Sequence, residues 1–265
     1  MSDAILLEVR DAVATITLNR PQALNALNHE MARALRDAAE RVEADASVRA
    51  VVVRGAGPHF MAGGDIKSFD AMLKMPEQER LADFEAIIGM VHDAVVRLRR
   101  MEKPVVAAVQ GAVAGFGLSL MNACDLAVAA DNAYFTLAYC HLGTSPDGGA
   151  TWGLPRLVGL KQAMEIALLG DRFDARRALE LGLVNRVVPV DALETETLDL
   201  AQRLAAGPTA AYAKTKRLLN ESGNRSLVEQ LQAEQDNFAA STLTEDFAEG
   251  VHAFVEKRKA RFRGC

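Results

Sequence analysis

Hydrophobic positions in the first half of the chain form short runs that are typical of buried strands. Residues 49–54 (RAVVVR) and 104–110 (PVVAAVQ) are almost continuous apolar runs, and glycine follows each of them. Asn28 can cap an amphipathic helix that continues to about Glu43, and residues 77–101 repeat apolar side chains with a helical period. Strands that alternate with helices predict an α/β core. The predicted strands are Ile5–Val9, Val13–Leu18, Arg49–Arg54, Pro104–Gln110, Cys124–Ala130 and Val184–Val188.

From Pro155 onward the pattern is almost wholly helical, and no linker rich in proline or glycine interrupts it. We therefore predict one core over residues 1–200 and a helical C-terminal region over residues 201–265. The predicted helices cover 161–169, 175–181, 192–205, 209–219, 227–238 and 244–262.

The bulk composition does not favour several classes of partner. The chain has 265 residues, 50% of them hydrophobic, and a net charge of -5, which does not favour nucleic acid or an anionic membrane surface. No apolar run approaches the length needed to span a bilayer, so we expect no membrane insertion. The three cysteines, Cys124, Cys140 and Cys265, are widely spaced, which predicts a reducing cytoplasm and neither a disulfide framework nor a metal site.

Two glycine-rich segments carry the candidate chemistry. They are residues 55–69 (GAGPHFMAGGDIKSF) and 110–120 (QGAVAGFGLSL), and each lies between a predicted strand and a helix-like stretch. Glycine lets backbone N–H groups approach a ligand atom, and a helix N-terminus adds unpaired donors with partial positive charge. Two such donors aimed at one point form an oxyanion hole, worth about 2.7–4 kcal/mol per donor in the transition state. Neither segment matches the dinucleotide-binding or P-loop fingerprint.

The order of the motifs along the chain resembles the crotonase (enoyl-CoA hydratase/isomerase) superfamily over residues 5–263. The resemblance implies a crotonase-like spiral of repeated ββα turns with a C-terminal helical region for oligomerisation or for covering the site. It also implies an acyl-CoA thioester substrate, no cofactor beyond its coenzyme A moiety, and a homotrimer or homohexamer. The motifs are LNRPQALNAL (18–27), FMAGGDIKSF (60–69), KPVVAAVQGAVAGFG (103–117), CDLAVAA (124–130), GLPRLVGLKQAMEIALLGDRFDARRALELGLVNRVVP (153–189) and AFVEKRKARF (253–262).

The resemblance also implies which residues form the site. The N–H groups of Gly64 and Phe116 correspond to the two oxyanion donors. Phe116 stands where the family usually has glycine, but any residue other than proline still offers its N–H. Lys257, in the predicted C-terminal helix, resembles a lysine that reaches coenzyme A phosphate from an adjacent subunit. The coenzyme A positions implied within the chain are Ala23, Leu24, Ala62, Gly64, Asp65, Ile66 and Lys67.

The two glutamates that hydratases of this family use fall on Ser119 and Tyr139, so hydration by two glutamates is disfavoured. Asp147, in the segment GTSPDGGATW, resembles the proton-transferring aspartate of the family's dienoyl-CoA and ring-epoxide isomerases. Removal of a proton next to a thioester requires such a base within hydrogen-bond reach. We expect an apolar pocket around Asp147 to raise its pKa. Tyr139 is a further candidate catalytic residue, whose hydroxyl could donate a proton or orient a water molecule, although packing is its expected main role.

Several interpretations remain open. From its local sequence alone Asp147 suits a turn, because aspartate is common in turns, and the resemblance is what favours a catalytic role. The leading hypothesis is isomerisation of an enoyl-CoA double bond. The alternatives are hydration of a branched or terpenoid enoyl-CoA, hydrolytic dehalogenation of an aryl- or acyl-CoA, and a non-catalytic acyl-CoA binder. The dehalogenase hypothesis would use His92 near Asp147, and the roles of His92 and His141 are left open. We expect His59 to support its loop.

Overall fold

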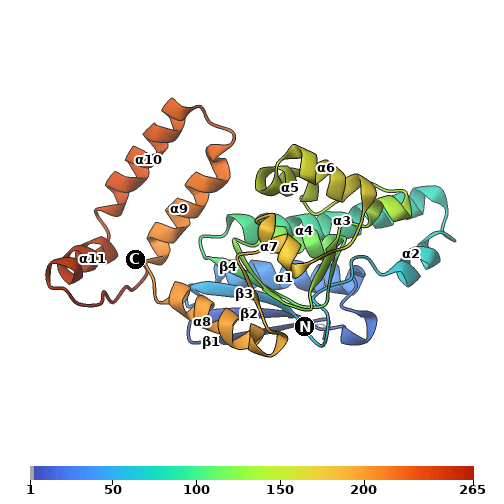
Figure 1. The fold of residues 1–265 in the computed structure, drawn as a ribbon, viewed down its shortest axis with the longest axis horizontal. Coiled ribbons are helices and arrows are strands. Elements are labelled where there is room, and N and C mark those ends of the chain that lie inside the picture. The colour runs from blue at the N-terminus through green and yellow to red at the C-terminus, as the bar shows by residue number, and fades with distance from the viewer. Residues whose placement is uncertain (1–2) are drawn as a thin grey trace.

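The computed structural model describes residues 3–265 and contains two sheets (Figure 1). The strands of the larger sheet run parallel, except that the edge strand β1 is antiparallel to β2. This sheet has the order β1 (Ile5–Arg10), β2 (Val13–Leu18), β3 (Ala50–Gly55), β4 (Val105–Val109), β6 (Leu126–Ala130) and β9 (Arg186–Val188). The smaller sheet has the order β5 (Ala112–Ala114), β7 (Tyr134–Thr136) and β8 (Phe173–Asp174).

Successive turns of the chain stack on one another. Strand β4 is followed by β5 and strand β6 by β7, so each of these turns adds one strand to each sheet. Met61 pairs with Val113 and Val113 with Phe135, both in parallel, which places equivalent points of three turns side by side. Phe173 of the antiparallel strand β8 extends this row beyond Phe135. The predicted spiral α/β fold is confirmed. The strands of the smaller sheet were not predicted, because runs of two or three residues are too short to show a period.

Helices bury both faces of the larger sheet. In β3, Val51 and Val53 face the core cluster shared with α1 and α3, whereas Val52 faces the cluster shared with α8. Burial of both faces explains the continuous apolar runs. The helices that join this core are α1 (His29–Ala44), α2 (Ile66–Met72), α3 (Glu77–Arg100), α4 (Phe116–Ala123), α5 (Ala150–Val158), α6 (Leu160–Leu169), α7 (Ala175–Glu180) and α8 (Leu193–Ala205).

Helix α5 was not predicted, because Gly149 precedes it and Pro155 lies inside it, and both residues usually signal a break.

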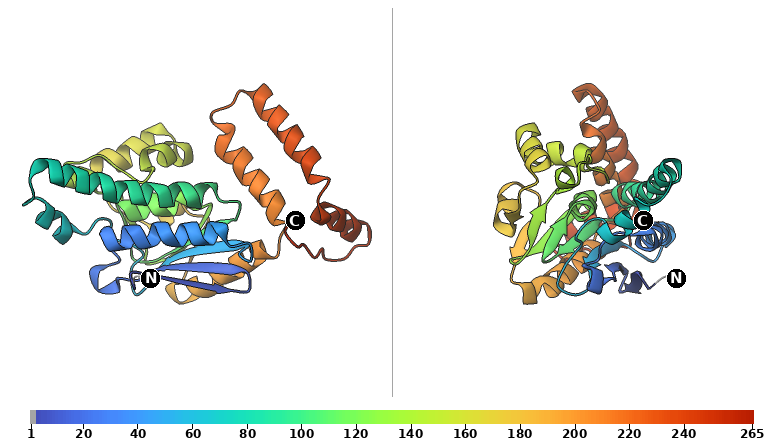
Figure 2. Two further views of the ribbon diagram at one scale, coloured as in Figure 1. Left: turned by 180° about the vertical axis from the view of Figure 1, so that it is seen from behind. Right: turned by 90° about the vertical axis from the view of Figure 1, so that its right-hand side faces the viewer.

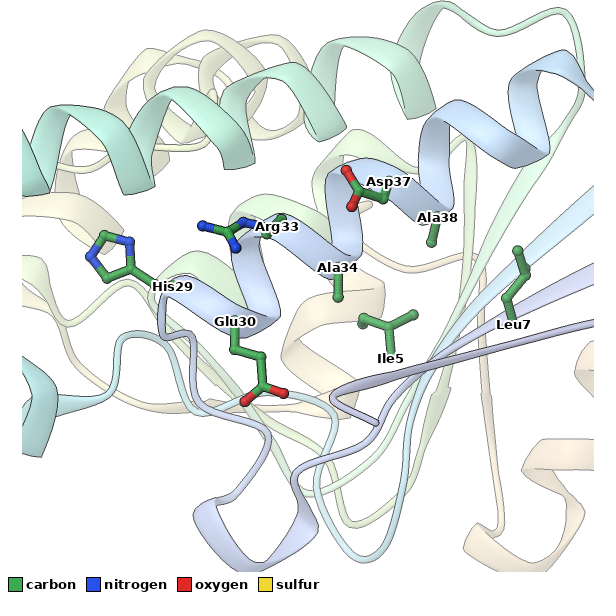
Figure 3. Close-up of a pocket in the computed structure, with 8 residues that line it drawn as sticks. All are labelled: Ile5, Leu7, His29, Glu30, Arg33, Ala34, Asp37 and Ala38. Atoms are coloured by element: carbon green, nitrogen blue, oxygen red, sulfur yellow. The ribbon is translucent and has the colours of Figure 1, made fainter. Parts of the chain in front are cut away.

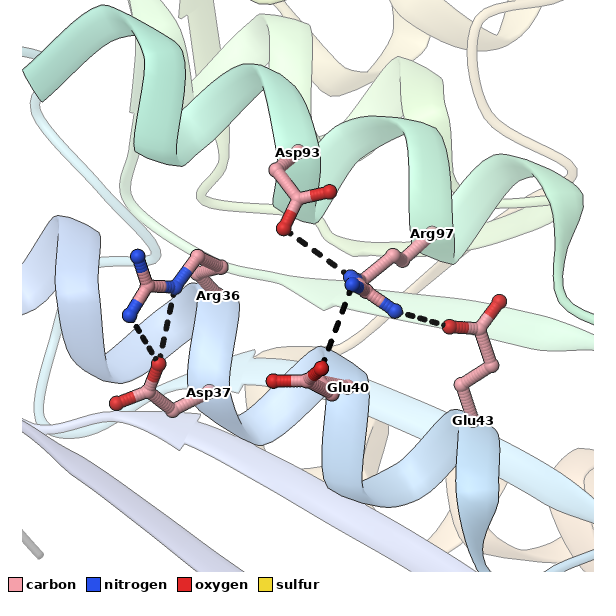
Figure 4. Close-up of polar contacts among 6 residues, drawn as sticks. All are labelled: Arg36, Asp37, Glu40, Glu43, Asp93 and Arg97. Atoms are coloured by element: carbon pink, nitrogen blue, oxygen red, sulfur yellow. Dashed lines mark hydrogen bonds and ion pairs between the residues drawn. The ribbon is translucent and has the colours of Figure 1, made fainter. Parts of the chain in front are cut away.

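An ion-pair cluster joins α1 to α3 (Figure 4). Arg97 of α3 lies between Asp93, one turn earlier on the same helix, and the carboxylates of Glu40 and Glu43 on α1. Because one guanidinium serves three acceptors, the cluster orders fewer side chains per contact than separate pairs would. It therefore helps to fix the position of α3, which forms a wall of the cavity described below.

The remaining helices form an arm that leaves the core (Figures 1 and 2). They are α9 (Thr209–Ser222), α10 (Leu227–Ser241) and α11 (Glu245–Val255). Helix α8 continues across residue 200 and packs on the sheet, so the arm begins only after it. No helix in residues 3–265 combines the length and the apolar character needed to cross a membrane.

The predicted helix over 244–262 is wrong at its C-terminal end. Helix α11 ends at Val255, because Lys257 adopts a left-handed backbone conformation with φ of 54°. The amides of Lys257 and Arg258 donate to the carbonyl groups of Phe254 and Ala253 at 3.3 and 3.0 Å, which is the hydrogen-bond pattern of a Schellman helix end. The chain then turns back, and the carboxylate of the buried Asp246 accepts from the amides of residues 263 and 264.

The side chain of Lys216 fastens α9 to the core. Its ammonium group donates to the carbonyl groups of Leu98 and Lys103, both at 3.0 Å, and lies 2.7 Å from the carboxylate of Asp125. The Lys216 side chain is only 10% exposed. Removal of one partner of a buried ion pair leaves the other charge unpaired, which costs more than the loss of a surface pair.

We predict that Lys216→Met lowers the free energy of unfolding by about 3–5 kcal/mol. Lys214→Met on the same helix removes only a bond to the Ser241 hydroxyl and should cost less than about 1 kcal/mol. Chemical denaturation of the variants tests this. Adding Asp125→Asn to Lys216→Met should recover part of the loss, because the orphaned charge is then gone. Equal effects of Lys216→Met and Lys214→Met would contradict the prediction.

Candidate active site

The two glycine-rich segments lie against each other. Met61 donates to the carbonyl of Ala112 and accepts from the amide of Ala114, both at 2.9 Å. A Cβ atom added at Gly63 would lie 3.6 Å from the Cα atom of Gly115. Gly63 and Gly115 have φ values of 88° and 51°, which glycine adopts at little cost. The backbone amides of the residues that follow, Gly64 and Phe116, are therefore brought close together.

The amides of Gly64 and Phe116 are unpaired. Within residues 3–265 neither N–H donates a hydrogen bond, although the flanking Asp65 and Gly115 amides donate to the carbonyl groups of Leu27 and Thr136 at 2.8 and 3.0 Å. Phe116 is the first residue of α4, where helix amides lack partners and the helix dipole adds partial positive charge. Two unpaired donors on touching loops can stabilise one developing negative charge.

A cavity of about 570 Å³ opens beside these amides. One wall is apolar, and its rings Phe69 and Phe84 meet edge to face with centroids 5.2 Å apart. A Cβ atom at Gly64 would lie 2.4 Å from the Phe69 ring, so a side chain there would displace this wall. The apolar residues of this wall are Leu27, Ile66, Phe69, Phe84, Ile87 and Ile88.

Asp147 lies at the polar end of the cavity and is the only carboxylate among the described residues that line it. The Tyr139 hydroxyl donates a hydrogen bond to Asp147 Oδ1. Tyr139 packs against the core, as expected, and its hydroxyl also makes this polar contact, which was not predicted. Tyr139 is the first residue of a short 3-10 turn, Tyr139–Leu142, which the sequence pattern did not show.

Burial sets the ionisation of this pair. It raises the pKa of Asp147, and the hydrogen bond from Tyr139 offsets only part of this effect. The direction agrees with the expectation from the sequence. Burial and the neighbouring carboxylate also raise the pKa of Tyr139, so the phenol keeps its proton and remains a donor. A buried carboxylate that holds a proton more readily than usual is suited to proton transfer.

Three further polar residues contact this end of the site. The Ser119 hydroxyl, in a residue 1% exposed, donates to the carbonyl oxygen of Asp147 at 3.0 Å. His92 Nε2 accepts from the amide of Gly148 at 3.2 Å. His141 lies at the rim, where its Nε2 donates to the carbonyl of Gly170 at 3.2 Å.

The positions predicted for coenzyme A fall mainly along one edge of the cavity. Ala62 and Ile66 line the cavity. The Ala62 amide donates to the Leu24 carbonyl at 3.1 Å, so the turn that contains Ala23 and Leu24 adjoins the same edge. Lys67 is exposed on α2.

The side chain of Asp65 has a structural role. Its carboxylate pairs with Arg20 at 2.9 Å and caps α2 by accepting from the amide of Ser68 at 3.3 Å. Burial favours the neutral acid, but these partners together outweigh burial and lower the pKa of Asp65.

The structure does not bring Lys257 to this cavity within one chain. The residue follows α11, which lies on the far side of the molecule from α2 (Figures 1 and 2). A second hollow, of about 510 Å³ between α1 and β1, contains none of the predicted site residues (Figure 3). Within residues 3–265 no group of three or more His, Cys, Asp or Glu side chains is arranged to hold a metal ion.

Sequence reasoning missed Asn25, which organises the loop beside the site. Its side chain is fully buried, accepts from the amide of Arg20 and donates to the carbonyl groups of Ala56 and His59. The positive φ of 54° at Asn25 is one that asparagine tolerates better than most residues, which was the available signal. His59 Nδ1 accepts from the amide of Ala112 at 3.0 Å, which confirms its expected role in the loop.

Comparisons with known proteins agree with this geometry. The family model described as enoyl-CoA hydratase/isomerase matches residues 8–264. The 1,2-epoxyphenylacetyl-CoA isomerase of Escherichia coli (strain K12) is 36% identical over 264 residues, covering 100% of both chains. The crotonyl-CoA hydratase of Syntrophomonas wolfei subsp. wolfei is 36% identical over 260 residues, covering 97% of both chains.

A solved structure is similarly close. The crystal structure of an enoyl-CoA hydratase from Polaromonas sp. JS666 matches with a TM-score of 0.91 at 36% identity, covering 98% of this chain and 99% of that one. Fold, motifs and whole-length similarity agree, and the chain belongs to the enoyl-CoA hydratase/isomerase family.

Proposed function

We propose that the protein shifts the carbon–carbon double bond of an enoyl-CoA thioester, with Asp147 as the group that moves the proton. The observation that carries this proposal is that Asp147 is the only carboxylate among the described residues lining the cavity. The positions where two glutamates would activate water hold Ser119 and Tyr139, and both side chains bond to Asp147 instead.

In the proposed reaction the thioester oxygen accepts hydrogen bonds from the amides of Gly64 and Phe116. Asp147 removes a proton from C2 or C4 of the acyl chain, and the electron pair moves onto the thioester oxygen to form an enolate. The enolate returns the electrons to the other carbon, which takes the proton back from Asp147. Atoms and electrons balance without a co-reactant, and each amide supplies about 2.7–4 kcal/mol of stabilisation.

Tyr139 orients the base in this scheme. A neutral phenol that donates to one carboxylate oxygen stabilises the charged form and restricts rotation of the carboxylate. The raised pKa of Tyr139 makes the phenol a poor acid, so we assign proton transfer to Asp147.

We extend the proposal to substrate binding and assembly. Coenzyme A would lie along Ala23, Leu24 and Ala62 and the start of α2, with no further cofactor. Lys257 would reach it from an adjacent subunit of a homotrimer or homohexamer. Large exposed apolar side chains on the arm support such an assembly, among them Leu243 at 88% and Phe254 at 86% exposure.

Hydration is the second candidate, because the Syntrophomonas wolfei relative is named a crotonyl-CoA hydratase. In this reaction Asp147 would activate a water molecule that adds to C3. Isomerisation leaves no solvent oxygen in the product, whereas hydration does.

We predict that Asp147→Asn lowers the rate of double-bond transfer about 10²–10⁴-fold, the usual range for loss of a general base. Mass spectrometry of enoyl-CoA thioesters in deuterated water measures the transfer together with exchange at C2 and C4. Asp83→Asn serves as the matched control. It removes a carboxylate on α3 that pairs with His29 of α1 and does not line the cavity, so this variant should retain the rate. An Asp147→Asn variant with near wild-type activity would show that another group moves the proton.

The same substrates incubated in ¹⁸O-labelled water should give isomerised product without the heavy oxygen. Isomerisation moves one proton and one double bond and adds no oxygen, so the product should keep the mass of the substrate. Accumulation of a 3-hydroxyacyl-CoA that carries the label would favour hydration and contradict the leading proposal.

The pH dependence follows from the burial of Asp147. The base must be ionised to accept a proton. The value of kcat/KM should therefore be highest above the pKa of Asp147 and should fall as the pH drops through that pKa. Because burial raises this pKa, the acid limb should lie above the ordinary aspartate value of 3.8.

Tyr139→Phe removes a hydrogen bond to the charged form of Asp147 and should move the acid limb to higher pH. A limb that stays in place or moves to lower pH would disprove the proposed coupling.

A further inference from the structure

We propose that Ser119 and His92 are positioning residues that hold the peptide group between Asp147 and Gly148 from both ends, and so set the direction of the Asp147 carboxylate. The inference rests on the proposed function, because it gives Asp147 the role of base. It extends that function to two residues that do not themselves move a proton.

The contacts converge on a single peptide group. The Ser119 hydroxyl donates to the carbonyl oxygen of Asp147 at 3.0 Å, and the amide of Gly148 donates to His92 Nε2 at 3.2 Å. These two backbone atoms belong to one planar unit. Holding both of them fixes the plane of the unit and the Asp147 Cα atom that lies in it, so the Asp147 Cα–Cβ bond can change direction only by rotation about the Cα–C bond.

These two hydrogen bonds restrain a segment around Asp147 that has no regular secondary structure. Asp147 belongs to neither a helix nor a strand, and Gly143, Gly148 and Gly149 nearby all have positive φ. Residues 143–145 are exposed. A segment of this kind has many accessible conformations unless tertiary contacts restrict it. Ser119 and His92 supply these contacts from α4 and α3.

Helix α4 links the base to the oxyanion hole. Phe116, whose amide is one of the two donors, is the first residue of α4, and Ser119 lies three residues later on the same helix. The distance between the proton acceptor and the donor is therefore fixed through one helical turn. An error of about 1 Å in such a distance can cost about 10²-fold in rate.

The ring of Phe116 packs against the same peptide group. A Cβ atom added at Gly148 would lie 2.8 Å from two atoms of this ring and 2.8 Å from the Cβ atom of Ser119. The turn after Asp147 therefore packs directly on α4. This contact gives a structural use to the phenylalanine that stands where the family usually has glycine.

The tautomer of His92 separates positioning from proton transfer. Because Nε2 accepts a hydrogen bond from an amide, the neutral ring carries its proton on Nδ1. The Nε2 atom that faces Asp147 and Gly148 therefore has no proton to give. Glutamine can place its amide oxygen near the position of Nε2 and accept the same bond, whereas leucine cannot.

The first test compares His92→Gln with His92→Leu in the deuterium-exchange assay. We expect His92→Leu to lower kcat about 10–100-fold and His92→Gln to stay within about threefold of wild type, since only the geometry of one hydrogen bond changes. His29→Leu, which breaks the contact of a histidine with Asp83 outside the site, is the matched control and should remain active. The dissociation constant for a saturated acyl-CoA should be unchanged in all three variants.

The second test asks whether both residues act through Asp147. In the wild-type background Ser119→Ala should lower kcat about 3–10-fold, as expected for one hydrogen bond. In the Asp147→Asn background neither Ser119→Ala nor His92→Leu should lower the residual rate further, because the group that they position has already lost its function.

The outcomes separate the two proposals. Equal losses in His92→Gln and His92→Leu would mean that His92 itself transfers a proton, and would overturn the positioning role. The positioning role would also be overturned if the losses persisted in the Asp147→Asn background, or if neither Ser119→Ala nor His92→Leu slowed an enzyme that depends on Asp147. A fully active Asp147→Asn variant would instead overturn the proposed function together with this inference.

Discussion

The site depends on the direct contact between two turns of the spiral at Met61 and Val113. The hydrogen bonds of Met61 with Ala112 and Ala114 bring Gly63 and Gly115 together, and the absence of side chains on both glycines allows the approach. The contact leaves the next two amides without partners in residues 3–265. Unpaired backbone donors are costly when buried, so their persistence beside a cavity indicates a place prepared for an acceptor.

The reacting groups are held by helices rather than by the loop that carries the base. Asp147 lies in an irregular segment, yet its side chain and its backbone carbonyl are bonded by Tyr139 and Ser119. Because α4 provides both Ser119 and the amide of Phe116, a shift of this helix would move base and oxyanion donor together. The arrangement keeps their separation constant, which matters because proton removal and charge stabilisation must occur in the same complex.

The sequence predicted those features that depend on local pattern. Continuous apolar runs predicted strands such as Ala50–Gly55, because both faces of the sheet are buried. The order of the motifs predicted the family and the free amides at Gly64 and Phe116. The contact of His92 with Gly148 could not be predicted, since it joins residues 56 apart in sequence. The contact of Tyr139 with Asp147 could not be predicted either, since it depends on the irregular path of the segment between them. The end of α11 was missed because Lys257, rather than a glycine, adopts the left-handed conformation there.

A crystal structure of the protein with an unreactive acyl-CoA analogue would test the central claim most directly. The account predicts that the thioester oxygen lies about 2.7–3.1 Å from the amide nitrogens of both Gly64 and Phe116, with the acyl carbons beside Asp147. A complex in which the thioester oxygen contacts neither amide, or in which protein acceptors occupy both of them, would contradict it.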